Sequence, residues 1–346
     1  MPFKVTANDV VKKLITEANK KGEFSGVVAA SRNGKRIFAY SIGFADSGSR
    51  IKIRRETKFR ISSITKQFTT VLLLQLVEEG KVDLDKPVAN YVDVPEARKN
   101  LERITARQLL SGSSMLPWLE SEDFYQGTDA DLTDARFVVK TYMTGDLRGE
   151  PGSKFGYNNA DFILAEAIIE SVSGKSYEAL LKEKVLDPLG MKNSGVIART
   201  GRIKGLAKGF IFEDGSLNGE RYETIANYGG SGAMYSTVGD MLKWNNAILY
   251  NSLIKRDLRD EMFSPSEKLG FVGLGSWIYD LKLSDTKTVR VVERQGGIGG
   301  FSAVNLILPD EEFSIIFLSN VRTGTLSQTY ASKGLSYQVL REFLAK

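Results

Sequence analysis

Four Ser-x-x-Lys motifs occur in this chain, beginning at Ser49, Ser63, Ser252 and Ser284. When such a motif is helical, the lysine lies on the same face as the serine and its amine stands beside the hydroxyl. A neutral amine in that place can take the hydroxyl proton and make the serine a nucleophile. The motif is short, so most of its occurrences are accidental and the surroundings must select the catalytic one.

Ser63 has the most suitable surroundings of the four. It stands at the start of a predicted helix over residues 64–79, with Lys66 in the first turn. Apolar residues occupy nearly every side of that helix, which predicts that it is buried. Burial would lower the pKa of Lys66, and the amides at a helix start can stabilise an oxyanion. The alternative is that Ser63 only caps the helix and that Lys66 is solvated.

The composition limits which groups can activate the serine. The 346 residues include no His and no Cys. A Ser-His-acid triad, a thiolate nucleophile and a cysteine-rich zinc site are therefore excluded. A base must come from Lys, Tyr, Asp or Glu. We see no acidic spacing of the EF-hand kind and expect no metal or other cofactor.

A second polar motif is Tyr157-Asn158-Asn159, the only Tyr-x-Asn sequence in the chain. It follows a Gly-containing turn and precedes a predicted helix. The Tyr157 hydroxyl on such a turn can pass a proton beside the nucleophile, and the Asn159 amide can orient Lys66 and a substrate amide. The alternative is a packed tyrosine followed by an asparagine cap.

The third motif is Arg294-Gln295-Gly296-Gly297, at the end of a predicted strand. Gly296 and Gly297 would let a substrate backbone lie against the strand edge. The Arg294 guanidinium offers two parallel donors to a substrate carboxylate. Alternatively, Arg294 turns to Glu293 or Glu311 and leaves the pocket to neutral esters.

Aromatic residues near these motifs are further candidates for the pocket wall. Tyr228, which precedes Gly229-Gly230, is the preferred substrate-binding candidate among Trp118, Tyr125, Tyr228 and Trp277. Aromatic residues also fill cores, which is the alternative for each of them.

Together, the three motifs resemble those of the penicillin-recognising serine enzymes. The group most similar contains the class C β-lactamases, their esterase relatives and D-alanyl-D-alanine carboxypeptidases. The likeness covers most of the chain and includes residues 82–88, 104–110, 188–193 and 239–244. It implies that Ser63 is acylated, that Lys66 and Tyr157 share the proton transfers, and that Asn159 holds the substrate amide or the lysine. It also implies an oxyanion hole formed by the backbone N–H groups of Ser63 and Gly297.

Two departures from the family pattern bear on the substrate. The third motif usually reads Lys-Thr-Gly or His-x-Gly, whereas this chain has Arg294-Gln295-Gly296. The usual His-Thr-Ser-Gly-Leu-Pro is replaced by Gly-Ser-Ser-Met-Leu-Pro over residues 112–117. Both changes favour hydrolysis of small esters, amides or peptides over β-lactamase action. An acyltransferase and a catalytically silent ligand-binding protein remain the alternatives.

The positions of polar and apolar residues predict the elements that carry the motifs. Helical periodicity covers residues 8–21, 64–79, 160–171, 177–185, 238–250 and 328–344, and alternation covers 24–31, 36–44, 289–293, 301–308 and 313–319. We therefore predict an α/β fold of α+β type: a mainly antiparallel sheet built from both chain ends, flanked by terminal helices and interrupted by a large helical insertion. The predicted lobes are 1–60 with 265–346, and 61–264, with the active site between them. The resemblance adds a β-lactamase/transpeptidase-like architecture.

The net charge of +5 is spread along the chain without a basic run. We therefore expect a small-molecule or peptide substrate and no nucleic-acid partner. No stretch approaches the length of a membrane span. The N-terminus lacks an apolar signal core, so the chain is cytoplasmic as given, or periplasmic or secreted if a signal peptide has been removed. The oligomeric state is left open.

Overall fold

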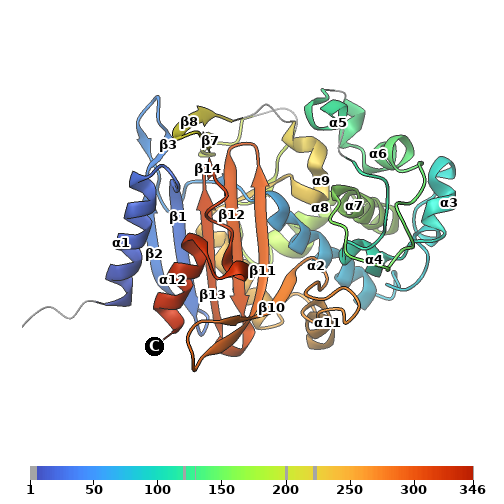
Figure 1. Cartoon of the computed structure of the whole chain (residues 1–346). Coiled ribbons are helices and arrows are strands. Elements are labelled where there is room, and N and C mark those ends of the chain that lie inside the picture. The colour runs from blue at the N-terminus through green and yellow to red at the C-terminus, as the bar shows by residue number, and fades with distance from the viewer. Residues whose placement is uncertain (1–5, 120–121, 129, 199–201, 221–223, 346) are drawn as a thin grey trace, which may run out of the picture.

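The computed structural model describes residues 6–119, 122–128, 130–198, 202–220 and 224–345. Its centre is a six-stranded antiparallel sheet with the strand order β10-β11-β12-β13-β1-β2 (Figure 1). The strands are β1 (Gly26–Arg32), β2 (Lys35–Ile42), β10 (Trp277–Lys282), β11 (Thr288–Ile298), β12 (Phe301–Leu308) and β13 (Phe313–Ser319). The predicted fold class is confirmed.

The two ends of the chain meet inside this sheet. Gly26 in β1 pairs with Ser319 in β13, and the register continues to Arg32 opposite Phe313. The predicted hairpin joins β1 to β2 through Asn33 and Gly34, whose φ angles of 50° and 71° are those of a tight hairpin turn. Every residue of β12 and β13 is buried, because helices cover both faces of the central strands.

The terminal helices lie together on one face of the sheet (Figure 1). Val11 and Ile15 of α1 (Ala7–Lys20) and Val339 and Leu340 of α12 (Gly334–Leu344) share one apolar core with strand residues. The other face packs on α10 (Val238–Leu249), which contacts β1 and β13. This part of the fold therefore has three layers: the terminal helices, the sheet and α10.

The remaining helices gather beside the sheet, around α2 (Thr65–Glu78) and α7 (Asn159–Ser173), which pack against each other (Figure 1). The others are α3 (Arg98–Leu101), α4 (Ala106–Leu110), α5 (Glu122–Gln126), α6 (Ala135–Tyr142), α8 (Tyr177–Leu181), α9 (Gly229–Gly232) and α11 (Arg256–Met262). Short strands complete the fold: β3 (Phe44–Asp46), β4 (Ile51–Lys52), β5 (Phe59–Arg60), β6 (Gly195–Val196), β7 (Phe210–Glu213), β8 (Ser216–Gly219), β9 (Met234–Ser236) and β14 (Val321–Arg322). Within the described ranges, no helix combines the length and apolarity needed to cross a bilayer.

Several elements differ from their predicted form, among them two strands and the last helix. The strand predicted over 289–293 extends to Ile298, so the Arg294–Gly297 motif lies within β11 and not after it. Strand β10 was not predicted at all. The last helix begins at Gly334 and not at residue 328, because a short 3₁₀ turn, Thr329–Ala331, precedes it.

Candidate active site

Ser63 lies in a 3₁₀ turn, Ser62–Ile64, which runs directly into α2. The preceding residue, Ser62, has a φ angle of 51°, a value that residues other than glycine rarely adopt. Backbone strain of this kind is concentrated at functional sites. The turn leaves Ser63 partly exposed at the wall of a pocket, although both of its neighbours are buried.

Lys66 is fully buried one turn after Ser63, and its amine is surrounded by three acceptors. Lys66 Nζ lies 2.8 Å from Asn159 Oδ1, 2.6 Å from the Ser231 carbonyl oxygen and 3.3 Å from Ser63 Oγ. A carbonyl and an amide oxygen can only accept. In the neutral amine, the two N–H bonds therefore point to Asn159 and Ser231, and the lone pair is left for the Ser63 proton.

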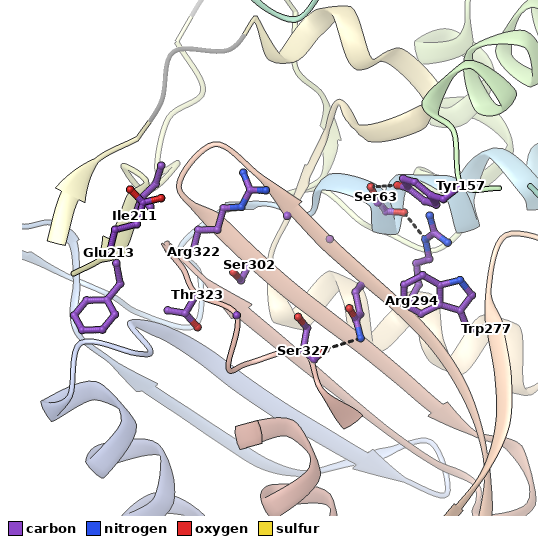
Figure 2. Close-up of a pocket in the computed structure, with 15 residues that line it drawn as sticks. Ser63, Tyr157, Ile211, Glu213, Trp277, Arg294, Ser302, Arg322, Thr323 and Ser327 are labelled. Carbon is purple, nitrogen blue, oxygen red and sulfur yellow. Dashed lines mark hydrogen bonds between the residues drawn. The ribbon is translucent and has the colours of Figure 1, made fainter. Parts of the chain in front are cut away.

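Tyr157 approaches the same hydroxyl from another segment of the chain. Its hydroxyl is hydrogen-bonded to Ser63 Oγ at 2.7 Å (Figure 2). Asn158 caps the following helix α7, and this cap fixes the short segment between Tyr157 and Asn159. Asn159 also donates through Nδ2 to the Tyr125 hydroxyl at 3.2 Å. The first two motifs of the sequence are thus brought to one point.

Burial and charge bring the proton affinities of Lys66 and Tyr157 close together. Burial lowers the pKa of Lys66 to about 8. The negative charge of the Tyr157 phenolate opposes this lowering, and the positive charge of Arg294 adds to it. Burial raises the pKa of the Tyr157 hydroxyl, but the positive charges of Lys66 and Arg294 outweigh it and lower that pKa to about 8. Because the two groups interact, they titrate as a pair. One proton can therefore move between Lys66 and Tyr157 at little cost.

The third motif lies across the pocket from α2, on β11. A Cβ atom at Gly296 would come within 2.2 Å of the Ile61 carbonyl oxygen, so only glycine allows β11 to pack against the turn that carries Ser63. Gly297 is exposed to the pocket. Strand β10 begins opposite Glu293, so no strand of the described chain pairs with the Arg294–Ile298 edge on that side.

Arg294 is buried, with 4% of its surface exposed. Its Nε donates to the Ser63 carbonyl oxygen at 3.1 Å, and its guanidinium lies 5.2 Å from the centre of the Tyr157 ring and 5.3 Å from that of Trp277 (Figure 2). Glu293 and Glu311, the predicted acidic alternatives, accept hydrogen bonds from Gln295 and Lys287. Arg294 therefore points towards the nucleophile and not towards either acid.

The pocket in front of Ser63 has a volume of about 710 Å³. Trp277 and Arg322 stand on opposite sides of it (Figure 2). It is lined by Ser63, Tyr157, Ile211, Phe212, Glu213, Trp277, Arg294, Gln295, Gly296, Gly297, Ser302, Arg322, Thr323, Gly324 and Ser327.

The other serines with a Ser-x-x-Lys sequence have different partners. The hydroxyl of Ser49 donates to Asp46, that of Ser252 to the Ala247 carbonyl, and that of Ser284 is bonded to Thr286. Of the four motifs, only the one at Ser63 has its lysine amine within hydrogen-bonding distance of the serine hydroxyl.

The aromatic candidates divide into three groups. Trp277 lines the pocket. Tyr228 is 93% buried, does not line the pocket with Ser63, and stacks on Tyr125 with ring centres 5.0 Å apart. Trp118 is exposed and lies against the Arg148 guanidinium at 3.6 Å. Of the four, Trp277 is directly available to a substrate, and contact between Tyr228 and substrate stays a prediction.

Ser231 and Arg322 are among the residues of the site that sequence reasoning did not identify. Ser231 supplies the carbonyl that accepts from Lys66, and it lies in the run Gly229–Gly232, whose glycines could have indicated a close backbone approach. Arg322 enters the pocket from β14, a strand of two residues without a recognisable pattern. Nothing in the sequence near Arg322 indicated its place.

Comparisons with known proteins match most of the chain. The sequence profile of the family described as "Beta-lactamase" matches residues 11–334. Penicillin-binding protein 4* of Bacillus subtilis (strain 168) is 26% identical over 335 residues, which cover 91% of this chain and 72% of that protein. Protein flp of Staphylococcus aureus (strain N315) is 25% identical over 324 residues, and the match spans 90% of this chain but only 63% of flp.

Solved structures show the same architecture. A penicillin binding protein from Bacillus halodurans superposes with a TM-score of 0.76 at 26% identity, over 96% of this chain and 98% of that one. The D-amino acid amidase of Ochrobactrum anthropi SV3, complexed with L-phenylalanine, gives a TM-score of 0.80 at 23% identity, over 98% and 97% of the two chains. At that identity the amidase bears on the fold alone.

Proposed function

Because this chain belongs to the beta-lactamase family, we propose that it is a serine hydrolase that forms an acyl-enzyme on Ser63 with small esters, amides or peptides. The observation that carries the proposal is the position of two proton acceptors around one hydroxyl. Tyr157 and Lys66 stand 2.7 Å and 3.3 Å from Ser63 Oγ, and both have a pKa of about 8. General bases are most effective when their pKa lies near the working pH.

In acylation, Ser63 Oγ attacks the substrate carbonyl carbon while its proton passes to the Lys66–Tyr157 pair. The negative oxygen of the tetrahedral intermediate is stabilised by the backbone N–H groups of Ser63 and Gly297. Tyr157, whose partly exposed ring faces the pocket, then returns the proton to the leaving group as the carbon–leaving-group bond breaks. In deacylation a water molecule attacks the ester, and the same pair takes its proton and gives it back to Ser63.

Asn159 and Arg294 set the properties of the pair. Asn159 holds the Lys66 amine through Oδ1, which keeps its lone pair directed at Ser63. Arg294 lowers the pKa of Tyr157 and donates a hydrogen bond to the Ser63 carbonyl oxygen, which fixes the position of that carbonyl. With 4% of its surface exposed, Arg294 has little area to offer a substrate carboxylate, and we assign it this positioning role.

Hydrolysis of esters and peptides is favoured over β-lactamase action because the third motif differs from the family pattern at both variable positions. The guanidinium of Arg294 is held by the Ser63 carbonyl, and Gln295 stands where relatives carry a small hydroxyl residue. Two of the relatives bear the name penicillin-binding protein, which makes penicillin the natural comparison substrate.

The test is steady-state hydrolysis of p-nitrophenyl esters, short peptides and benzylpenicillin by the purified chain and by Ser63→Ala. Turnover of esters or peptides that is absent in Ser63→Ala, with penicillin cleaved much more slowly or only acylating the enzyme, is the expected result. Hydrolysis that persists in Ser63→Ala, or no turnover of any ester or peptide, contradicts the proposal.

A further inference from the structure

Gln295 stands in the pocket wall with its side-chain amide fixed in one orientation. Its Nε2 donates to the Ser327 carbonyl at 2.9 Å and to Glu293 Oε1 at 2.7 Å. The amide group has two N–H donors, and both are used by these contacts. A peptide carbonyl can only accept, so the nitrogen, and not the oxygen, must face Ser327.

Glu293 is itself held in place from the other side. It is fully buried, and its second oxygen, Oε2, accepts from the Tyr279 hydroxyl. The carboxyl group therefore cannot turn away from Gln295 without leaving a buried hydroxyl unpaired, which is costly. Tyr279, Glu293 and the Ser327 carbonyl together lock the Gln295 amide.

The locked amide leaves its oxygen, Oε1, for the pocket. Gln295 is half-buried and lines the pocket in front of Ser63. No described residue donates to Oε1, and this atom is not among the buried polar atoms that lack a partner. Gln295 lies two residues from Gly297 on β11, roughly 7 Å along the strand at about 3.4 Å per residue.

A second hollow of about 660 Å³ adjoins the pocket at this point. It shares Trp277, Gln295, Gly324 and Ser327 with the pocket, and no Lys or Arg is among its lining residues. Exposed rings of Phe271 and Tyr330 stand in its wall. Aromatic faces and carbonyl oxygens without a competing cation suit a positively charged group.

From this geometry we propose that Gln295 sets the substrate class of the site: its fixed carbonyl oxygen accepts a hydrogen bond from an amide N–H or ammonium group of the substrate and repels a carboxylate. The inference rests on the proposed hydrolase function and deepens it. An amide oxygen can only accept, so the locked Oε1 offers a substrate carboxylate no donor.

The experiment uses two series of aryl esters that place a group about 7 Å from the scissile carbonyl. One series carries a meta substituent on the phenol leaving group, and the other carries it on the phenylacetyl group of p-nitrophenyl phenylacetate. The substituents are carboxylate, carboxamide and aminomethyl, with the unsubstituted ester as parent. The values compared are kcat/KM for the wild type, Gln295→Thr, Gln295→Ala and the control Gln338→Thr, whose side chain is exposed on α12.

In at least one series, the wild type is expected to prefer the carboxamide and aminomethyl esters over the carboxylate by about tenfold or more, as for a matched against a mismatched hydrogen bond. Both Gln295 variants are expected to bring that ratio close to one. Gln338→Thr is expected to keep the wild-type ratio.

A wild-type preference for the carboxylate in both series, or a ratio that survives in both Gln295 variants, overturns the proposal. The wild-type ratios serve as a test even if a variant fails to fold, which a thermal melt detects. Hydrolysis of the parent ester distinguishes failure of the subsite proposal from failure of the proposed hydrolase function. If Ser63→Ala abolishes its hydrolysis but the ratios do not depend on Gln295, only the subsite proposal is wrong; if no parent ester is cleaved through Ser63, the hydrolase proposal itself fails.

Discussion

Lys66 and Tyr157 share one proton in this account, which predicts that their contributions to acylation are not additive. The perturbations are Lys66→Ala, Tyr157→Phe and the double variant. Each single change removes one of the two groups within hydrogen-bonding distance of Ser63 Oγ. Each is expected to lower the acylation rate by roughly two to four orders of magnitude, the effect of losing a positioned acid–base group.

The double variant is expected to be about as slow as the slower single variant. Independent groups would multiply their effects and give roughly four to eight orders of magnitude. Here the first change already removes the transfer, because the pKa of each group is set partly by the other. Residues that act as a unit show this saturation.

The assay is single-turnover release of p-nitrophenol from an activated ester, with enzyme in excess so that acylation alone is observed. Tyr250→Phe serves as the matched control, because its hydroxyl bonds Glu312 outside the site and its rate should equal that of the wild type. Thermal melts identify variants that have lost their fold. A double variant as slow as the product of the two single losses, or a Tyr157→Phe rate within threefold of the wild type, would refute the shared-proton mechanism.

Three other predictions follow from the same geometry. The acylation rate should rise with pH through about 8 as the buried Lys66 amine loses its proton, and a stopped-flow profile controlled only near pH 4 would indicate a carboxylate base instead. Gly296→Ala should abolish acylation, since its Cβ would meet the Ile61 carbonyl oxygen at 2.2 Å, whereas Gly219→Ala in β8, with nothing within 4 Å, should be nearly silent; equal activity of the two variants would contradict the packing. Burial raises the pKa of Glu166 to about 8, from about 4.5 in the unfolded chain. The contribution of the protonated Glu166 to the free energy of unfolding is therefore full below pH 4.5 and is lost as the pH rises through 8. Glu166→Gln should remove at most ~5 kcal/mol of that pH-dependent loss of unfolding free energy, measured by denaturant unfolding between pH 4.5 and 9. An unchanged slope would show that Glu166 is ionised in the fold.

Much of the site could be predicted because its residues lie in local patterns. Ser63 and Lys66 belong to one helical turn, and the apolar residues around α2 predicted the burial that lowers the Lys66 pKa. Tyr157 and Asn159 belong to the only Tyr-x-Asn sequence in the chain. The central strands were predicted within about two residues from the alternation of their side chains, although every residue of β12 and β13 is buried.

The parts that were missed depend on contacts between distant segments. The sequence alone did not reveal that β11 continues past Glu293, because two glycines follow within four residues and glycine is unfavourable in strands. They are tolerated because Gly296 must approach the Ile61 carbonyl closely. Similarly, the orientation of Gln295 depends on Ser327, which is 32 residues away.

The sequence alone also did not predict where the Arg294 side chain points. Its motif was compatible with a substrate carboxylate or with a neighbouring acid. In the structure the turn that carries Ser63 packs against β11, Arg294 is buried, and its Nε donates to the Ser63 carbonyl oxygen. Tertiary packing, and not the local motif, decides the direction of this side chain, and contact between Arg294 and a substrate carboxylate stays a prediction.

The central claim is that Ser63 is the nucleophile, and covalent labelling tests it most directly. The protein is incubated with a fluorophosphonate at pH 8 and above, its intact mass is measured, and the adduct is located by peptide mapping in the wild type and in Ser63→Ala. We predict one adduct per chain, on Ser63, and no labelling of Ser63→Ala while its melting temperature stays that of a folded protein. An adduct on Ser49, Ser252 or Ser284, or undiminished labelling of Ser63→Ala, would contradict the account.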